Sequence, residues 1–173
     1  MFIWSSLAHI IALTSPGPDT AIIIRQVSLY GRRAGVLAAL GIGVGIYIHC
    51  LLAINGLSLL IISNVFYKFI ISVIGSAYIF YLGIKMLIPI PNEKNELSSK
   101  NKASSSFING LITNLFNIKA FIFFVSLFSI LVDSINGLYF YIYPLYFAFT
   151  SSLWFVLLSY LLTNKSFKKF NIS

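Results

Sequence analysis

Long apolar runs separated by short polar stretches dominate this chain. Five of these runs approach or exceed the length of about 20 residues that a helix needs to cross a bilayer. The runs cover residues 2–29, 34–62, 66–88, 107–132 and 138–162. We therefore predict an all-α integral membrane protein with about five transmembrane helices.

The first run is interrupted near its middle, where Ser15, Pro16, Gly17, Pro18 and Asp19 stand in succession. A proline inside a helix removes a backbone donor and costs about 3 kcal/mol. Each flank is too short to cross a bilayer alone, which predicts two half-helices forming one broken span. Such a break survives in hydrocarbon only where its free backbone groups are buried in protein or line a watery cavity. This stretch is therefore the candidate functional centre.

The fourth run is interrupted in a similar way, by Asn114, Asn117 and Lys119. The second interruption comes three spans after the first, so the second half of the chain is expected to enter the membrane upside down. Broken helices at matching positions of two inverted halves are the strongest sequence pointer to a transporter's binding site. We predict an inverted three-plus-three repeat that lacks its last helix, with a binding site between the two breaks.

A polar stretch rich in serine and lysine divides the chain at residues 89–106. Its composition is typical of a flexible loop in solvent. The predicted organisation is a first membrane half at 1–88, a cytoplasmic loop at 89–106, and an incomplete second half with a basic tail at 107–173.

Composition excludes several classes of protein. Only 9% of the residues are charged, against about 25% in soluble domains. The net charge of +8 does not indicate nucleic-acid binding, because the basic residues lie between apolar runs rather than in one patch. The single Cys50 excludes an internal disulfide.

The basic residues also predict how the chain is oriented. Ten of the twelve lie at the end of the first, third or fifth run or after it: Arg25, Arg32, Arg33, Lys85, Lys94, Lys100, Lys102, Lys165, Lys168 and Lys169. The positive-inside rule then places the N-terminus outside, and the loop and the C-terminus in the cytoplasm.

The ordered set of motifs resembles the LysE/RhtB superfamily of amino-acid exporters. The matching residues are Ser15-Pro16-Gly17-Pro18-Asp19, Gly31-Arg32-Arg33-Ala34-Gly35, Gly41, Gly45, Tyr81-Leu82-Gly83, Phe107, Gly110 and Asn114-x-x-Asn117-Ile118-Lys119-Ala120. The resemblance implies a multi-pass protein of the bacterial inner (plasma) membrane that exports amino acids or small zwitterionic metabolites in exchange for protons.

Two features depart from that family. Ile118 stands where the family usually has proline, so the second break lacks its stiffest element. The sixth span that family members have is also missing. The alternative hypothesis is therefore an inactive truncated remnant, or a membrane subunit that a partner chain completes, for example in a homodimer.

The candidate pathway residues each have a structural alternative. Asp19 is either an N-cap of the second half-helix or part of a substrate or proton pathway. Lys119 is either a snorkelling lysine or a charge partner of Asp19. Asn114 and Asn117 either cap the broken helix or contact substrate.

The remaining candidates favour structure over chemistry. Helix packing explains the glycines Gly35, Gly41, Gly45, Gly83 and Gly110. His9 and His49 show no ligand spacing, so they are expected to pack rather than bind metal. No cofactor is indicated. Of the four acidic residues only Asp19 is expected within the membrane, too few for an enzyme's acid–base or metal cluster.

Overall fold

The computed structural model describes residues 2–56, 63–67, 69–70, 73, 77, 80–81, 84, 99–131 and 137–164. Every regular element within these residues is a helix. The predicted all-α fold is confirmed. The predicted third run, including Gly83, lies mostly outside the described residues, as do residues 89–98 and the basic tail.

Six helices have defined bounds. They are α1 (Phe2–Thr14), α2 (Pro18–Tyr30), α3 (Arg32–Ile54), α6 (Ser99–Leu115), α7 (Ile118–Leu131) and α8 (Tyr139–Thr163). By length and composition, α3 and α8 are each able to cross a membrane. The predicted first, second, fourth and fifth runs thus correspond to helical structure.

Both predicted breaks are present. The α1 and α2 axes differ by 51° across residues 15–17, and Ser105–Leu115 and α7 differ by 57° across residues 116–117. Each bent pair passes the test for a membrane span only when its two helices are taken together. The first and fourth runs are therefore broken spans.

The predicted loop at 89–106 is wrong in its last part, because α6 already begins at Ser99. Extending an existing helix costs far less than starting one, and this stretch contains no proline or glycine to stop it. Ser106, predicted to lie in solvent, is instead completely buried. At the other end of the second run, α3 ends at Ile54 and a turn at Asn55–Gly56 follows.

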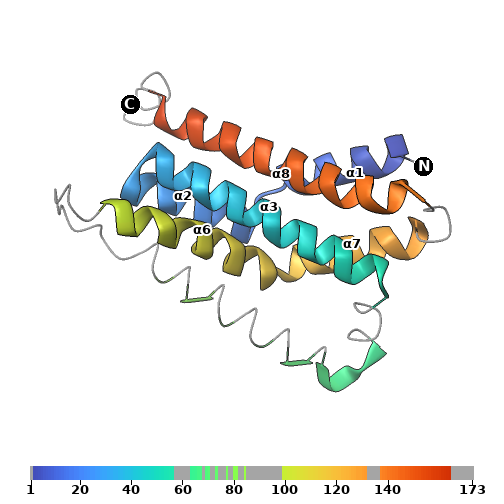
Figure 1. The fold of residues 1–173 in the computed structure, drawn as a ribbon. Helices are drawn as coiled ribbons and strands as arrows, with labels where there is room; N and C mark the ends of the chain where they lie inside the picture. Colours follow the sequence, from blue (N-terminus) through green and yellow to red (C-terminus); the bar gives the residue numbers. More distant parts are fainter. Residues whose placement is uncertain are drawn as a thin grey trace.

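The helices surround α3, which contacts α2, α6, α7 and α8. Figure 1 shows the direction of each span. The first broken span starts at the right, near the N-terminus, and α2 ends at the left. The second broken span starts at the left with α6 and ends at the right with α7. The two broken spans therefore run in opposite directions, as an inverted arrangement requires.

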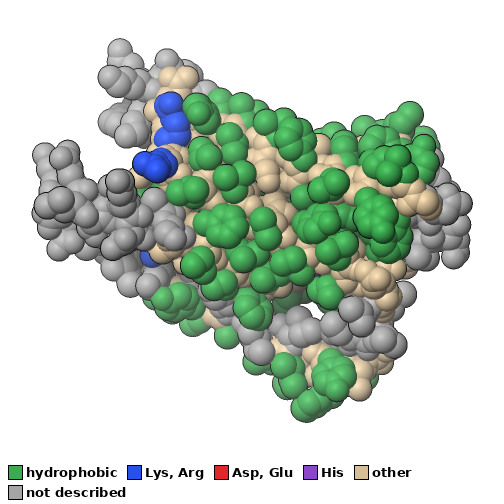
Figure 2. All heavy atoms as spheres, viewed as in Figure 1, with side chains coloured by type: hydrophobic (Ala, Val, Ile, Leu, Met, Phe, Trp, Pro, Cys, Tyr) green, Lys and Arg blue, Asp and Glu red, His purple; other side chains and the backbone are tan. Residues whose placement is uncertain are grey.

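Apolar side chains cover the outside as well as the core, as Figure 2 shows for one face. Exposed residues along α8 include Leu138, Tyr141, Leu145, Phe149, Leu153 and Leu157. Buried polar groups, by contrast, gather inside. Since lipid is as apolar as these side chains, this surface suits a bilayer and identifies a multi-pass membrane protein.

Glycines bring α3 and α6 into backbone contact. A Cβ atom on Gly41 would overlap the backbone of Phe107 and Leu111, and one on Gly110 would overlap the backbone of Ala38. Gly35 lies instead against the side chains of Val27 of α2 and Ser159 of α8. Larger residues at these positions would push the helices apart.

Candidate functional site between the two helix breaks

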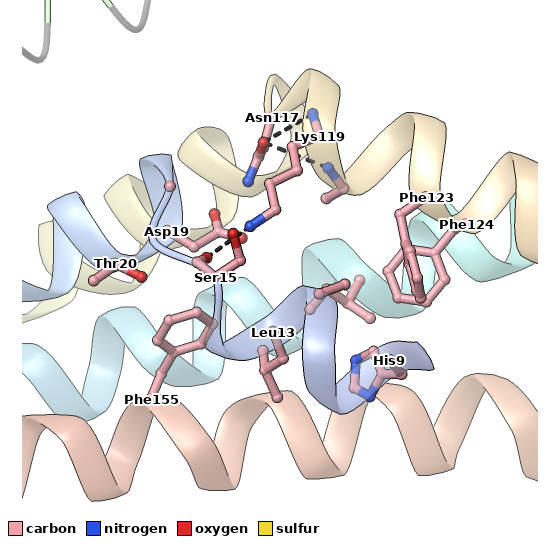
Figure 3. Close-up of a pocket in the computed structure, with 14 residues that line it drawn as sticks. His9, Leu13, Ser15, Asp19, Thr20, Asn117, Lys119, Phe123, Phe124 and Phe155 are labelled. Carbon is pink, nitrogen blue, oxygen red and sulfur yellow. Dashed lines mark hydrogen bonds between the residues drawn. The ribbon is translucent and has the colours of Figure 1, made fainter. Parts of the chain in front are cut away.

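The two helix breaks lie against each other. Lys119, in the first turn of α7, donates a hydrogen bond from its Nζ to the backbone oxygen of Ser15, 2.6 Å away (Figure 3). Ser15 follows the last residue of α1, where carbonyl groups lose their partners within the helix. The ammonium group therefore satisfies a carbonyl that the break leaves free.

Asp19 lies at the junction of the two breaks. Its side chain is 9% exposed, and its Oδ2 accepts a hydrogen bond of 2.9 Å from Asn114 Nδ2. Its Oδ1 is also buried and has no hydrogen-bond partner among the described residues. The same is true of Asn114 Oδ1. Two acceptor oxygens are thus buried without a donor at the centre of the molecule.

The sequence left open whether Asp19 is the N-cap of the second half-helix, and the structure shows that it is not. Gly17 occupies the N-cap position of α2, Pro18 is its first residue, and no side chain caps this end. Asp19 falls in the first turn instead, where the positive end of the helix dipole stabilises a carboxylate. Its side chain is free to turn toward α6.

The predicted charge partnership between Asp19 and Lys119 takes the form of an electrostatic interaction, while the ammonium group of Lys119 donates its hydrogen bond to Ser15 rather than to the carboxylate. Lys119 is exposed and bonds to the Ser15 carbonyl. The sequence correctly predicted that the two breaks lie together. It could not predict which group on the first break accepts the hydrogen bond from the Lys119 ammonium group.

Asn117 and Asn114 have different roles. Asn117 Oδ1 accepts hydrogen bonds from the backbone amides of Lys119 at 3.1 Å and Ala120 at 3.4 Å. It therefore caps α7, as the structural alternative predicted. Asn114 contacts Asp19, and its side chain fits against Gly45, where an added Cβ would lie 2.5 Å from Asn114 Oδ1.

Both histidines bond to polar groups on distant helices. His49 Nε2 lies 3.0 Å from the backbone oxygen of Asn114; a carbonyl only accepts, so His49 donates. His9 Nε2 lies 3.0 Å from Ser151 Oγ on α8. Nδ1 of each ring is buried and has no partner in the described residues.

A pocket of about 50 Å³ lies beside these groups. It is lined by His9, Ala12, Leu13, Ser15, Gly17, Asp19, Thr20, Ile46, Asn117, Lys119, Ala120, Phe123, Phe124 and Phe155. Figure 3 shows the polar groups at the breaks and the apolar and aromatic groups, with His9, along α1, α7 and α8. This volume has room for several waters or part of a small solute.

Five of the eight predicted pathway residues line the pocket: Ser15, Gly17, Asp19, Asn117 and Lys119. Asn114 touches it through Asp19, while Pro16 and Pro18 shape the break without lining the pocket. Sequence reasoning missed His9. Its partner Ser151 lies 142 positions away in a continuous apolar run, so no local spacing connects them.

The residues suit recognition of a small charged molecule by hydrogen bonds and charge. Within the described part of the chain, no three His, Cys, Asp or Glu residues form a group that is able to hold a metal ion. The pocket offers one carboxylate, one ammonium and several hydrogen-bonding groups, the set that a zwitterion needs for both of its ends.

Comparison with known proteins identifies the family. The family model described as LysE type translocator matches residues 10–169. The chain belongs to this family. Among relatives of this translocator, the threonine efflux protein of Escherichia coli (strain K12) is 33% identical over 145 residues, which cover 79% of this chain and 69% of the relative.

Two further relatives show the range of similarity to this chain. The threonine efflux protein of Salmonella typhimurium is 32% identical over 142 residues, covering 79% of this chain and 69% of that protein. The uncharacterized membrane protein YrhP of Bacillus subtilis is 30% identical over 132 residues, covering 70% and 62% respectively. No solved structure matches.

Proposed function

We propose that this protein is a secondary transporter that exports a small amino acid such as threonine. The observation that carries the proposal is the Asp19 carboxylate, buried between two broken helices with one oxygen free of any hydrogen bond. A charged group at membrane depth is expensive and marks a substrate or ion pathway. The printed names of two relatives, both threonine efflux proteins, support the substrate class.

Each end of a zwitterion has a partner in this arrangement. The substrate's ammonium group meets Asp19, and its carboxylate meets Lys119 and the positive end of the α2 dipole. Leu13, Phe123 and Phe124 surround the substrate's side chain. Because the pocket is small, the side chain it favours is short.

Proton coupling is part of the proposal. Asp19 holds either the substrate's ammonium group or a proton, but not both, because each neutralises the same carboxylate. Loading of substrate on the inner side then releases a proton, and loss of substrate on the outer side lets Asp19 take one up. Exchange of these two occupants is the simplest antiport that one buried carboxylate supports.

Export assays with an Asp19→Asn variant test this role. Asparagine keeps the shape and the acceptor for Asn114, but it removes the charge. Cells that lack their own exporters would be loaded with labelled threonine and its efflux measured. We expect Asp19→Asn to lower the efflux rate at least about tenfold, roughly 1.4 kcal/mol or more, at an equal amount of protein in the membrane.

The matched control is Ser129→Ala, since this exposed hydroxyl bonds only to Ser126 within α7. It should export at the native rate. Equal export by Asp19→Asn and the native chain would remove Asp19 from the mechanism. A native chain that reaches the membrane but exports none of a panel of amino acids would favour the alternative of a remnant or partner-dependent subunit.

A further inference from the structure

A second buried polar pair joins α2 to α6, away from the pocket. Ser106 Oγ donates a hydrogen bond of 2.8 Å to Gln26 Oε1, and both side chains are completely buried. Gln26 Nε2 is buried as well and has no hydrogen-bond partner within the part of the chain that the structure describes. Leaving a buried donor unpaired costs about 1–3 kcal/mol. The amide therefore calls for a role besides packing.

The pair lies on the same seam as Asp19 and Asn114. Gln26 follows Asp19 by seven residues, two turns of α2, and Ser106 precedes Asn114 by eight residues of α6. At about 1.5 Å of rise per residue, the two hydrogen bonds are separated by roughly 10–12 Å along the helices. The α2–α6 seam thus carries one polar pair at the pocket and another toward the end where α2 meets α3.

The seam differs from the other contacts of α6. On its other side, α6 meets α3 through backbone contacts at Gly41 and Gly110, which leave no room for a side chain. Such interlocked backbones do not separate without a large loss of packing. Two side-chain hydrogen bonds join α2 to α6, by contrast, and polar groups of this kind exchange partners readily.

The pocket meets this seam at Asp19, which lines the pocket and bonds to Asn114 of α6. From Asp19 the contact between α2 and α6 continues toward Gln26 and Ser106. A substrate that moves between the pocket and the end where α2 meets α3 would therefore follow this seam.

We propose that Gln26 and Ser106 form a latch that closes the α2–α6 seam, and that the seam is the inner gate of the transporter. The proposal rests on the transport function proposed above. When the latch opens, α2 moves away from α6, which stays fixed to α3. The freed amide and hydroxyl then line the opening and bond to water or to the passing zwitterion.

Thiol labelling tests the gate without relying on transport. Thr20 lines the pocket, and Cys50 is the single native cysteine, so Thr20→Cys in a Cys50→Ala background gives one reporter thiol. A membrane-impermeant maleimide is applied to inside-out vesicles, and separately to intact cells. Ser106→Ala or Gln26→Leu should raise the labelling rate from the inner side at least about threefold and lower it from the outer side.

The matched control is Ser159→Ala. This serine is also completely buried and also near the end where α8 finishes, but its hydroxyl bonds to Phe155 within its own helix. Both labelling rates should stay unchanged in it. Gln26→Asn, which keeps an amide but shortens its reach, serves as a second latch variant if Gln26→Leu fails to accumulate. Unchanged labelling in the latch variants would overturn the proposal.

Cross-linking gives an independent measurement. In a Cys50→Ala background, a short bifunctional methanethiosulfonate, which forms reducible disulfides, would join Gln26→Cys to Ser106→Cys, and the control pair is Ser28→Cys with Ile108→Cys on exposed faces of the same helices. Only the Gln26→Cys/Ser106→Cys protein should lose export when the reagent is added and regain it on reduction. Full export by the linked protein would contradict the proposal that the seam is a gate. If the native chain exports nothing, the proposed function fails while the labelling result still decides the gate.

Discussion

Individual polar residues carry most of the specificity of this molecule, and the sequence identified them better than it paired them. Asp19, Asn114 and Lys119 were predicted because charged and amide groups are rare inside apolar runs. Their partners depend on side-chain direction, which sequence spacing does not determine. Lys119 reaches the Ser15 carbonyl rather than Asp19, and Asp19 bonds to Asn114 instead.

Histidines were harder to interpret. A lone histidine in an apolar helix is most often a packing residue, and both rings do pack against phenylalanines, as His9 does against Phe147 at 4.8 Å. Only the three-dimensional arrangement shows that His9 lines the pocket and that His49 holds the Asn114 carbonyl. Nothing in the order of residues distinguishes these roles.

The Lys119 contact makes a prediction at this scale. Lys119→Met keeps the length of the side chain but loses the donor to Ser15. The contact is exposed, so we expect the free energy of unfolding to fall by about 0.5–1.5 kcal/mol, measured by thermal unfolding in detergent. The export rate per folded protein should fall as well, because the pocket loses its one ammonium group.

Lys119→Arg is the control, since it keeps a cation with donors at a similar reach. It should retain most of the stability and part of the export. If Lys119→Met exports as well as the native chain, the substrate's carboxylate does not depend on this residue, and the dipole of α2 becomes the main candidate for it.

Among the helices, proline marks the position of the first break but not that of the second, which forms without it. The sequence predicted that the second break would be weakened, because Ile118 replaces the expected proline. The bend there is 57°, against 51° at the break that contains two prolines. The amide of Asn117 caps α7 and fixes its start without proline.

This result predicts that Ile118→Pro is tolerated. Ile118 is the first residue of α7, the position where a proline loses no hydrogen bond and its ring geometry already fits. We expect the free energy of unfolding to rise by about 0.4–1 kcal/mol, because the unfolded chain loses conformational freedom. Denaturation in detergent would measure the change.

Ile122→Pro is the control, one turn further along the same helix. There a proline removes an internal hydrogen bond and should cost about 3 kcal/mol or more. Equal destabilisation by the two substitutions would mean that α7 effectively starts before Ile118 and that Asn117 is not its cap.

At the scale of the whole molecule, the sequence predicted the number and order of the helical spans. This prediction depends on the lengths of the apolar runs and the order of the breaks, which do not change when a helix boundary is misplaced by a few residues. The opposite directions of the two broken spans, visible in Figure 1, follow from the number of spans between them. The start of α6 at Ser99 could not be predicted, since a polar composition resembles a loop until burial of Ser106 against Gln26 is known.

The distribution of charge makes the last prediction. The described Lys and Arg side chains visible in Figure 2 gather at the left end, where α2 meets α3 and α8 finishes. The N-terminus and the start of α8 lie at the other end. We therefore expect the basic end to face the cytoplasm, because positively charged segments are retained on that side during insertion.

Single reporter cysteines in a Cys50→Ala background measure this orientation. Arg33 is exposed at the basic end, and Leu138, 72% exposed, lies at the opposite end. An impermeant maleimide should label Arg33→Cys only in inside-out vesicles and Leu138→Cys only in intact cells. Reversed labelling would turn the α2–α6 seam into an outer gate. Labelling of both positions from one side would contradict a single crossing by α8, because Leu138 and the end of that helix would then share a membrane face.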